Sequence, residues 1–178
     1  AGIDYWTRDY DMSGGDLGSM LTKGATRDGM KAAMTALYRE LPVEQAPAYR
    51  EMFQRLAAGE VPLAFNCSAG KDRAGTAAAL ILSVLGVPDE TVFADYAMSG
   101  ELLKKSNMMS QSRDSKAFGP LAKLPPEVLE PLMASDPDYI KTAFASIREK
   151  HGSIENYVRK DLGITDAQIA SIRSNFLE

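Results

Sequence analysis

The chain has few of the residues that build covalent or metal-linked frameworks. Its 178 residues include one cysteine, Cys67, and one histidine, His151, which lie far apart in the sequence. A single cysteine excludes an internal disulfide, and this pair excludes a zinc cluster with the usual spacing of Cys and His ligands. We expect neither a metal nor another cofactor. Cys67 is therefore either a small buried side chain or a reactive group.

The sequence also lacks long apolar runs and an excess of positive charge. No stretch of about eighteen apolar residues occurs, so a transmembrane segment is not expected. The formal net charge of −4 argues against a broad surface for nucleic acid. No signal peptide is visible, and either a cytoplasmic or a secreted location fits. The length and composition favour one domain over residues 1–178.

The spacing of apolar residues predicts a largely helical chain with two short strands. Residues 3–6 and 61–65 have a strand-like composition, and the second run is predicted to be buried. Residues 104–123 are polar, basic and poorly periodic, which is typical of a mobile loop or lid. Helices are predicted at residues 26–41, 47–58, 73–85, 88–103, 125–134, 137–150, 154–161 and 166–177.

Two strands are too few for a stable sheet. Because helices connect them along the chain, the two strands would pair in parallel, and a parallel sheet needs further strands and cover on both faces. We therefore expect an α/β fold with its N-terminal strands missing from this chain. Thr165 and Gln168 have the spacing of a capping box at the last helix, whereas Pro42 is expected to end the first one.

The central motif is the stretch from residue 65 to residue 86, which reads FNCSAGKDRAGTAAALILSVLG. Cys67 and Arg73 are separated by five residues, with a predicted strand before them and a helix after them. The backbone N–H groups of residues 68–73 can converge on one anion, since Gly70 permits unusual backbone angles and the helix N-terminus adds positive charge. The Arg73 guanidinium suits phosphate. This segment predicts a loop that binds phosphate or another oxyanion.

The same segment predicts a reaction. A thiol at a helix N-terminus beside a guanidinium is expected to be a thiolate at neutral pH. It can attack a bound phosphate ester and form a phosphocysteine, which water then hydrolyses. The departing oxygen needs a proton, and Asp72 is the nearest carboxyl group in the sequence. An ATP-binding loop is excluded because Phe65 and Asp72 replace its first glycine and its magnesium-binding hydroxyl.

CSAGKDR resembles the signature of the cysteine-dependent phosphatases. NCSAGKDRAG is most similar to a bacterial branch with sequences of the HCxAGKDRTG kind, and ADYAMS at 94–99 and HGSIENYVRKDLGIT at 151–165 resemble its downstream segments. The resemblance implies the three-layer α/β fold of the protein tyrosine phosphatases, in which helices flank a small, mostly parallel sheet. It also implies hydrolysis of phosphotyrosine, with phosphoserine, phosphothreonine and phosphoinositide monoesters as further substrates.

This resemblance assigns roles to individual residues. Cys67 is the nucleophile, Arg73 binds the phosphate, and Asp72 is the general acid, with Asp9 as a rival. Lys71 would present a second cation to the substrate. The ring of backbone amides around the phosphate comprises Ser68, Ala69, Gly70, Lys71, Asp72 and Arg73.

Two positions depart from the family pattern. Asn66 stands where many relatives have histidine, and Ala74 stands where the family usually has Thr or Ser. Because that hydroxyl commonly assists release of the phosphocysteine, we expect either slow hydrolysis of the intermediate or a Cys67 thiol that ionises less readily. A pseudophosphatase that binds phosphorylated partners without turnover is an alternative. Arsenate reduction is rejected because it needs further cysteines.

Simpler interpretations stand beside these roles. Asp72 could hold the loop through hydrogen bonds, Asp9 could be a turn residue, and Lys71 could be a solvated surface charge. Tyr38 and Tyr96 lie at helical spacing among apolar residues, which is typical of core residues, although either could line the cleft.

Overall fold

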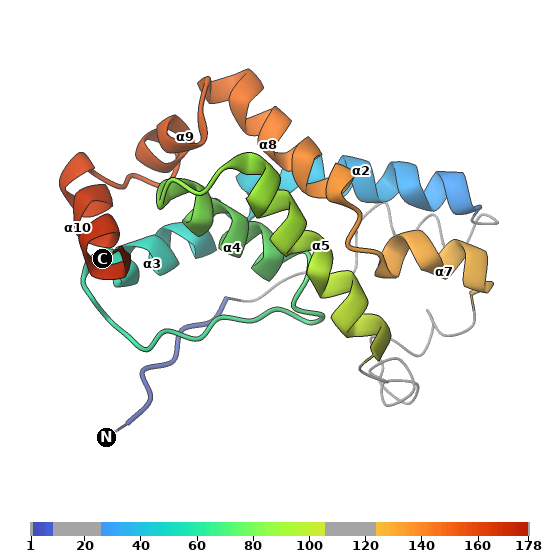
Figure 1. The fold of residues 1–178 in the computed structure, drawn as a ribbon, viewed down its shortest axis with the longest axis horizontal. Helices are drawn as coiled ribbons and strands as arrows, with labels where there is room; N and C mark the ends of the chain where they lie inside the picture. The colour runs from blue at the N-terminus through green and yellow to red at the C-terminus, as the bar shows by residue number, and fades with distance from the viewer. Residues whose placement is uncertain (1, 9–25, 106–123, 178) are drawn as a thin grey trace.

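The computed structural model describes residues 2–8, 26–105 and 124–177. Within these residues the protein consists of eight α-helices and contains no β-strand (Figure 1). In chain order the helices are α2 (Arg27–Glu44), α3 (Ala46–Ala57), α4 (Arg73–Val84), α5 (Asp89–Lys105), α7 (Pro126–Met133), α8 (Pro137–His151), α9 (Ile154–Lys160) and α10 (Asp166–Phe176).

The helix ends follow local chemistry. Thr165 and Gln168 form the predicted capping box at the start of α10, with side chain and backbone bonded in both directions. The predicted end of α2 at Pro42 is wrong, because the helix continues through this residue to Glu44. Pro42 lies in the last turn of the helix, where its missing N–H removes a single backbone bond.

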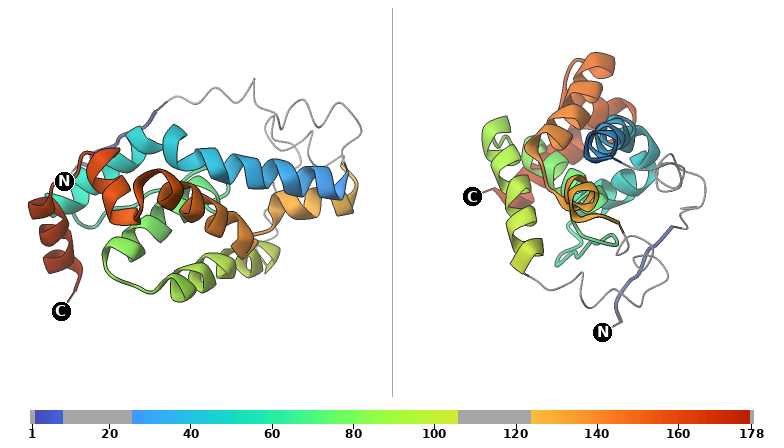
Figure 2. Two further views of the ribbon diagram at one scale, coloured as in Figure 1. Left: turned by 90° about the horizontal axis from the view of Figure 1, so that it is seen from above. Right: turned by 90° about the vertical axis from the view of Figure 1, so that its right-hand side faces the viewer.

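The helices pack around α4, which lies in the middle of the molecule in contact with α2, α5, α8 and α9 (Figure 1). The long helices α2 and α8 run side by side, α7 covers one end of α2, and α10 packs on α3 at the opposite end (Figure 2). This arrangement places the start of α4 between α2 and α5. The largest buried side chains of the core include Tyr38, Phe53, Leu80, Ile140, Phe144 and Leu162.

The prediction of a three-layer α/β fold with a small parallel sheet is wrong for the described residues. Neither residues 3–6 nor residues 61–65 form a strand there, and their side chains are not buried: Ile3 is 94% exposed and Phe65 is 42% exposed. Apolar composition alone does not make a strand, because a strand requires hydrogen bonds to a neighbour. Pro62 also lacks the N–H for such a bond.

The predicted lid at residues 104–123 lies outside the described residues, apart from its first two positions. These two, residues 104 and 105, belong to the last turn of α5. The helix is therefore longer than the prediction, which ended it at residue 103.

The packing of α8 generates a test of the fold. Ile140 is fully buried in the core, so Ile140→Ala should lower the free energy of unfolding by about 2–5 kcal/mol through lost contacts and a residual cavity. Val43, which is 53% exposed on α2, provides the control, and Val43→Ala should change stability by less than about 0.5 kcal/mol. Urea denaturation measures both. Equal stability of the two variants would contradict this position of α8.

Candidate active site

The turn at residues 67–72 leads directly into α4, whose first residue is Arg73; residues 67–73 are called the loop below. Gly70 has a φ of 76°, a left-handed conformation that glycine adopts without strain. A Cβ atom there would meet nothing within 4 Å, so the backbone angle, not lack of space, favours glycine. Because α4 begins at Arg73, the loop ends at a helix N-terminus. The N–H groups at a helix N-terminus and the helix dipole favour a bound anion.

The nucleophile and the phosphate-binding guanidinium predicted from the sequence lie in this loop. Cys67 is a partly buried free thiol at its first position. Arg73 Nη2 donates a hydrogen bond to Ser68 Oγ at 2.9 Å, across the width of the loop. The structure thus brings Arg73 to the residue that follows Cys67. Ser68 is predicted from the sequence as part of the ring of amides, but no sequence signal indicates the contact of its hydroxyl with Arg73.

Lys71 points into the protein. Its residue is 1% exposed, and its Nζ donates to Asp72 Oδ1 at 2.6 Å. The structure therefore does not place this ammonium as a solvated surface charge, nor as a second cation offered to an external substrate. A buried ammonium requires a partner, and the neighbouring carboxylate supplies it through a charge-assisted hydrogen bond.

Asp72 is held by Tyr38 as well as by Lys71, and Tyr38 is in turn bonded to Tyr96. Tyr38, on α2, donates from its hydroxyl to the same Oδ1 atom at 2.7 Å, and the hydroxyls of Tyr38 and Tyr96 are 2.5 Å apart. Tyr38 is fully buried, Tyr96 is 3% exposed, and the Asp72 side chain keeps 23% of its surface exposed. Asp72 thus connects the loop to α2 directly and to α5 through Tyr38.

Two further contacts hold the start of α4 in place. The hydroxyl of Tyr49, on α3, donates to the Arg73 carbonyl oxygen at 3.1 Å. Gly75 lies against Tyr96, and a Cβ atom at position 75 would come within 3.1 Å of the Tyr96 ring. Because a contact of that length would displace the ring, Gly75 allows Tyr96 to approach close enough to reach Tyr38.

Burial dominates the electrostatics of these phenols. It raises the pKa of Tyr38 far above its ordinary value, and the negative charge of Asp72 raises it further. Burial likewise raises the pKa of Tyr96, and that of the neighbouring Tyr139 to about 12. All three phenols therefore keep their protons at neutral pH, so each hydroxyl has one proton to donate.

Position 74 lacks the hydroxyl that the family usually has there. Ala74 is the second residue of α4, and Thr76, the nearest hydroxyl further along the helix, is completely buried. Thr76 Oγ1 has no hydrogen-bond partner in the described part of the chain. It therefore does not replace a hydroxyl at position 74. The rival general acid, Asp9, lies outside the described residues.

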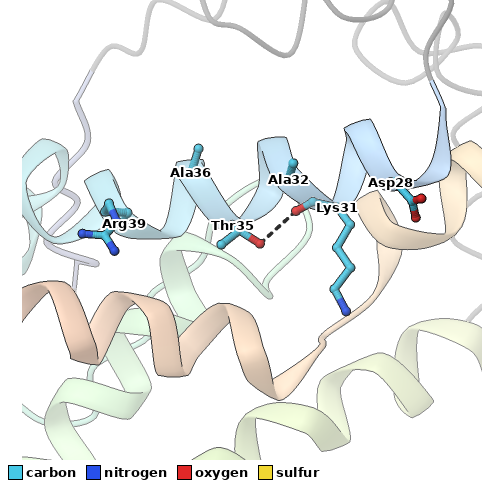
Figure 3. Close-up of a pocket in the computed structure, with 6 residues that line it drawn as sticks. All are labelled: Asp28, Lys31, Ala32, Thr35, Ala36 and Arg39. Atoms are coloured by element: carbon cyan, nitrogen blue, oxygen red, sulfur yellow. Dashed lines mark hydrogen bonds between the residues drawn. The ribbon is translucent and has the colours of Figure 1, made fainter.

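A hollow of about 540 Å³ lies on the surface of α2, but it is not part of this site (Figure 3). Both cations that line it form salt bridges: Lys31 pairs with Asp136 and Arg39 pairs with Glu149, each at 3.1 Å. No loop residue lines it. Its lining residues are Asp28, Lys31, Ala32, Thr35, Ala36 and Arg39.

Among the residues that the structure describes, no group of three or more His, Cys, Asp and Glu side chains is arranged to hold a metal ion. In the same part of the chain, no helix has both the length and the apolar character needed to cross a bilayer.

Comparison with known proteins identifies the family to which this chain belongs. The sequence model of the tyrosine phosphatase family matches residues 11–178. The chain is also similar to a provisionally named tyrosine-protein phosphatase of Cupriavidus necator, with 32% identity over 157 residues, which is 87% of this chain and 54% of that protein. The chain belongs to the tyrosine phosphatase family.

Two more relatives have related names. The triple specificity protein phosphatase PtpB of Mycobacterium tuberculosis is 29% identical over 182 residues, which covers 94% of this chain and 62% of PtpB. A tyrosine-protein phosphatase of Nostoc commune is 28% identical over 132 residues, or 71% of this chain and 43% of that protein. The chain thus spans about half the length of these relatives. The resemblance predicted from the loop sequence is confirmed at the level of the family.

The contact between Ser68 and Arg73 leads to a binding prediction. Ser68→Ala removes the oxygen that holds the guanidinium, so the affinity for inorganic phosphate should fall roughly 3- to 10-fold. Isothermal titration calorimetry measures this change. Ser174→Ala, at an exposed position on α10, serves as the control and should leave the affinity unchanged. Unaltered phosphate binding in the Ser68 variant would show that this contact does not orient Arg73.

Proposed function

We propose that the protein is a cysteine-dependent phosphoric monoester hydrolase that acts on phosphotyrosine through a phosphocysteine intermediate. The observation that carries this proposal is the position of Cys67 and Arg73 at the two ends of a loop that opens into the N-terminus of α4. Residues 1–178 act as one phosphatase domain. The chemistry requires no metal ion, because the loop itself supplies both the nucleophile and the positive charge.

The first step transfers the phosphoryl group to the protein. The Cys67 thiolate attacks phosphorus while the amides of residues 68–73 and the Arg73 guanidinium bind the phosphate oxygens. The bond between phosphorus and the leaving oxygen breaks, and this oxygen takes a proton from Asp72. The products are a phosphocysteine, a carboxylate at Asp72 and a free alcohol or phenol.

The second step regenerates the thiolate. Water attacks the phosphocysteine, the Asp72 carboxylate accepts a proton from that water, and the bond between sulfur and phosphorus breaks. With Ala74 in the place of a hydroxyl, the departing thiolate lacks one donor next to it. The second step is therefore the slower one in this protein.

The substrate class follows from the loop and from the relatives. Phosphotyrosine is the primary substrate, consistent with the family. The name of PtpB states a triple specificity, which supports more than one class of substrate. The further substrates in this proposal are phosphoserine, phosphothreonine and phosphoinositide monoesters. Because Lys71 is buried, the phosphate is bound by the loop amides and Arg73. The Lys71 charge therefore does not select between substrates that differ in the alcohol or phenol esterified to the phosphate.

The alternative of a binding module without turnover finds no support in the comparisons. All three relatives carry the name of a phosphatase. The absence of a hydroxyl at position 74 affects the second step, and the nucleophile and guanidinium of the first step are present. An enzyme with a slow second step therefore accounts for the residues better than a binding module does.

The nucleophile assignment predicts a burst of product. With p-nitrophenyl phosphate in excess EDTA, stopped-flow absorbance should show rapid release of about one p-nitrophenol per chain, followed by slower turnover, since Ala74 delays hydrolysis of the phosphocysteine. Cys67→Ser should abolish both phases while it keeps phosphate binding. Activity that survives in the Cys67→Ser variant would overturn the mechanism, and absence of any release despite phosphate binding would support the binding module.

The role of Asp72 predicts a dependence on the leaving group. Asp72→Asn should lower kcat/KM for phenyl phosphate by about 100-fold or more, because a poor leaving group needs the proton. It should affect p-nitrophenyl phosphate much less. The matched variant Asp9→Asn tests the rival acid, and should leave both substrates nearly unchanged. Equal loss for both substrates in Asp72→Asn would instead show a structural role for this carboxylate.

A further inference from the structure

The hydroxyls around Asp72 form a chain with one direction. Tyr38 has a single hydroxyl proton, which it donates to Asp72 Oδ1. The hydrogen bond of 2.5 Å between Tyr38 and Tyr96 must therefore take its proton from Tyr96. The order of donation runs from Tyr96 to Tyr38 to Asp72, and Lys71 Nζ donates to the same carboxylate oxygen from another side.

This directed chain distinguishes the two oxygens of Asp72. Oδ1 already accepts two hydrogen bonds, one from the ammonium of Lys71 and one from the phenol of Tyr38. An oxygen with both acceptor positions filled has no room for a proton of its own. A proton on the neutral carboxyl group must then reside on Oδ2. The Asp72 side chain is partly exposed, so the carboxyl group is not sealed from an external substrate.

We propose that Tyr38, backed by Tyr96, is a positioning residue that fixes Oδ1 of Asp72 toward the interior and leaves Oδ2 as the oxygen that delivers the proton. This inference rests on the proposed phosphatase function. It also unites the two interpretations of Asp72, because the same carboxyl group holds the loop through one oxygen and exchanges a proton through the other.

The donors on Oδ1 also assist the transfer. When Oδ2 gives its proton to the leaving oxygen, negative charge develops on the carboxylate, and the hydrogen bonds from Lys71 and Tyr38 stabilise that charge. When the carboxylate later takes a proton from the attacking water, the same two bonds keep it in position for the next cycle. Of Asp72, Tyr38 and Tyr96, only Asp72 loses and regains a proton, and the two phenols keep theirs.

The surrounding packing holds this chain rigidly. Tyr38 is fully buried and its ring lies against two others, with centroid distances of 6.1 Å to Tyr96 and 5.3 Å to Tyr139. Gly75 gives the Tyr96 ring its close approach to α4. The three helices α2, α4 and α5 thus meet at a single set of hydroxyl contacts beside the loop.

The test removes one hydroxyl at a time and keeps each ring. Tyr38→Phe should lower kcat/KM for phenyl phosphate by about 10-fold, and for p-nitrophenyl phosphate by less than about 2-fold. This parameter reports phosphocysteine formation, so a slow second step does not mask the effect. Tyr96→Phe should produce the same pattern with a smaller loss, since it acts on Asp72 only through Tyr38.

A matched control separates positioning from stability. Tyr139 is also buried and also donates one hydrogen bond, to the Pro131 carbonyl at 3.0 Å, but it does not contact Asp72. Tyr139→Phe should therefore leave the leaving-group dependence of kcat/KM unchanged. Thermal unfolding of Tyr38→Phe and Tyr139→Phe measures how much stability each variant loses with its hydroxyl, independently of catalysis.

The decisive measurement is the double variant Tyr38→Phe/Asp72→Asn. Because Tyr38 acts through Asp72, the double variant should be no slower than Asp72→Asn alone. Additive losses, or an equal loss for both substrates in Tyr38→Phe, would overturn the positioning role while the phosphatase mechanism stands. A Cys67→Ser variant that keeps activity would instead remove the proposed function itself, so the two failures are distinguishable.

Discussion

One oxygen of Asp72, Oδ1, accepts hydrogen bonds from the buried ammonium of Lys71 and the buried phenol of Tyr38. The position of the loop depends on these two hydrogen bonds. Lys71 could not be buried without a partner, and Asp72 is adjacent to it in the chain. Tyr38 then connects the pair to α2, and Tyr96 extends the connection to α5. Hydrogen bonds in a protein interior strengthen one another when every polar group has a partner, so this set of contacts specifies one arrangement of the loop.

The two cations of the loop consequently serve different purposes. Lys71 faces the interior and donates a hydrogen bond to Asp72, whereas Arg73 reaches Ser68 at the other side of the loop. A phosphate in the loop would therefore meet one guanidinium and the amides at the N-terminus of α4. The positive end of the helix supplies charge without a side chain, which limits the number of exposed cations that the site needs.

The sequence predicted the helices well because their signals are local: apolar spacing and caps such as Thr165 with Gln168 depend on neighbouring residues alone. The predicted strand at residues 61–65 does not form, because pairing depends on distant parts of the chain and Pro62 has no N–H to donate to a neighbouring strand. The motif from Cys67 to Arg73 was visible as a pattern. The hydroxyl partners of Tyr38 and Tyr96 were not, since apolar spacing predicts burial of a ring but not where its hydroxyl points.

The contact between Gly75 and Tyr96 joins two segments that the sequence presents as separate motifs. A side chain at position 75 would need space that the Tyr96 ring now occupies. Among relatives that keep this arrangement, a larger residue at position 75 should be accompanied by a smaller one at position 96. The two positions, on neighbouring helices, are thus expected to change together during evolution, and Gly75, in the first turn of α4, is a packing partner of a tyrosine on α5.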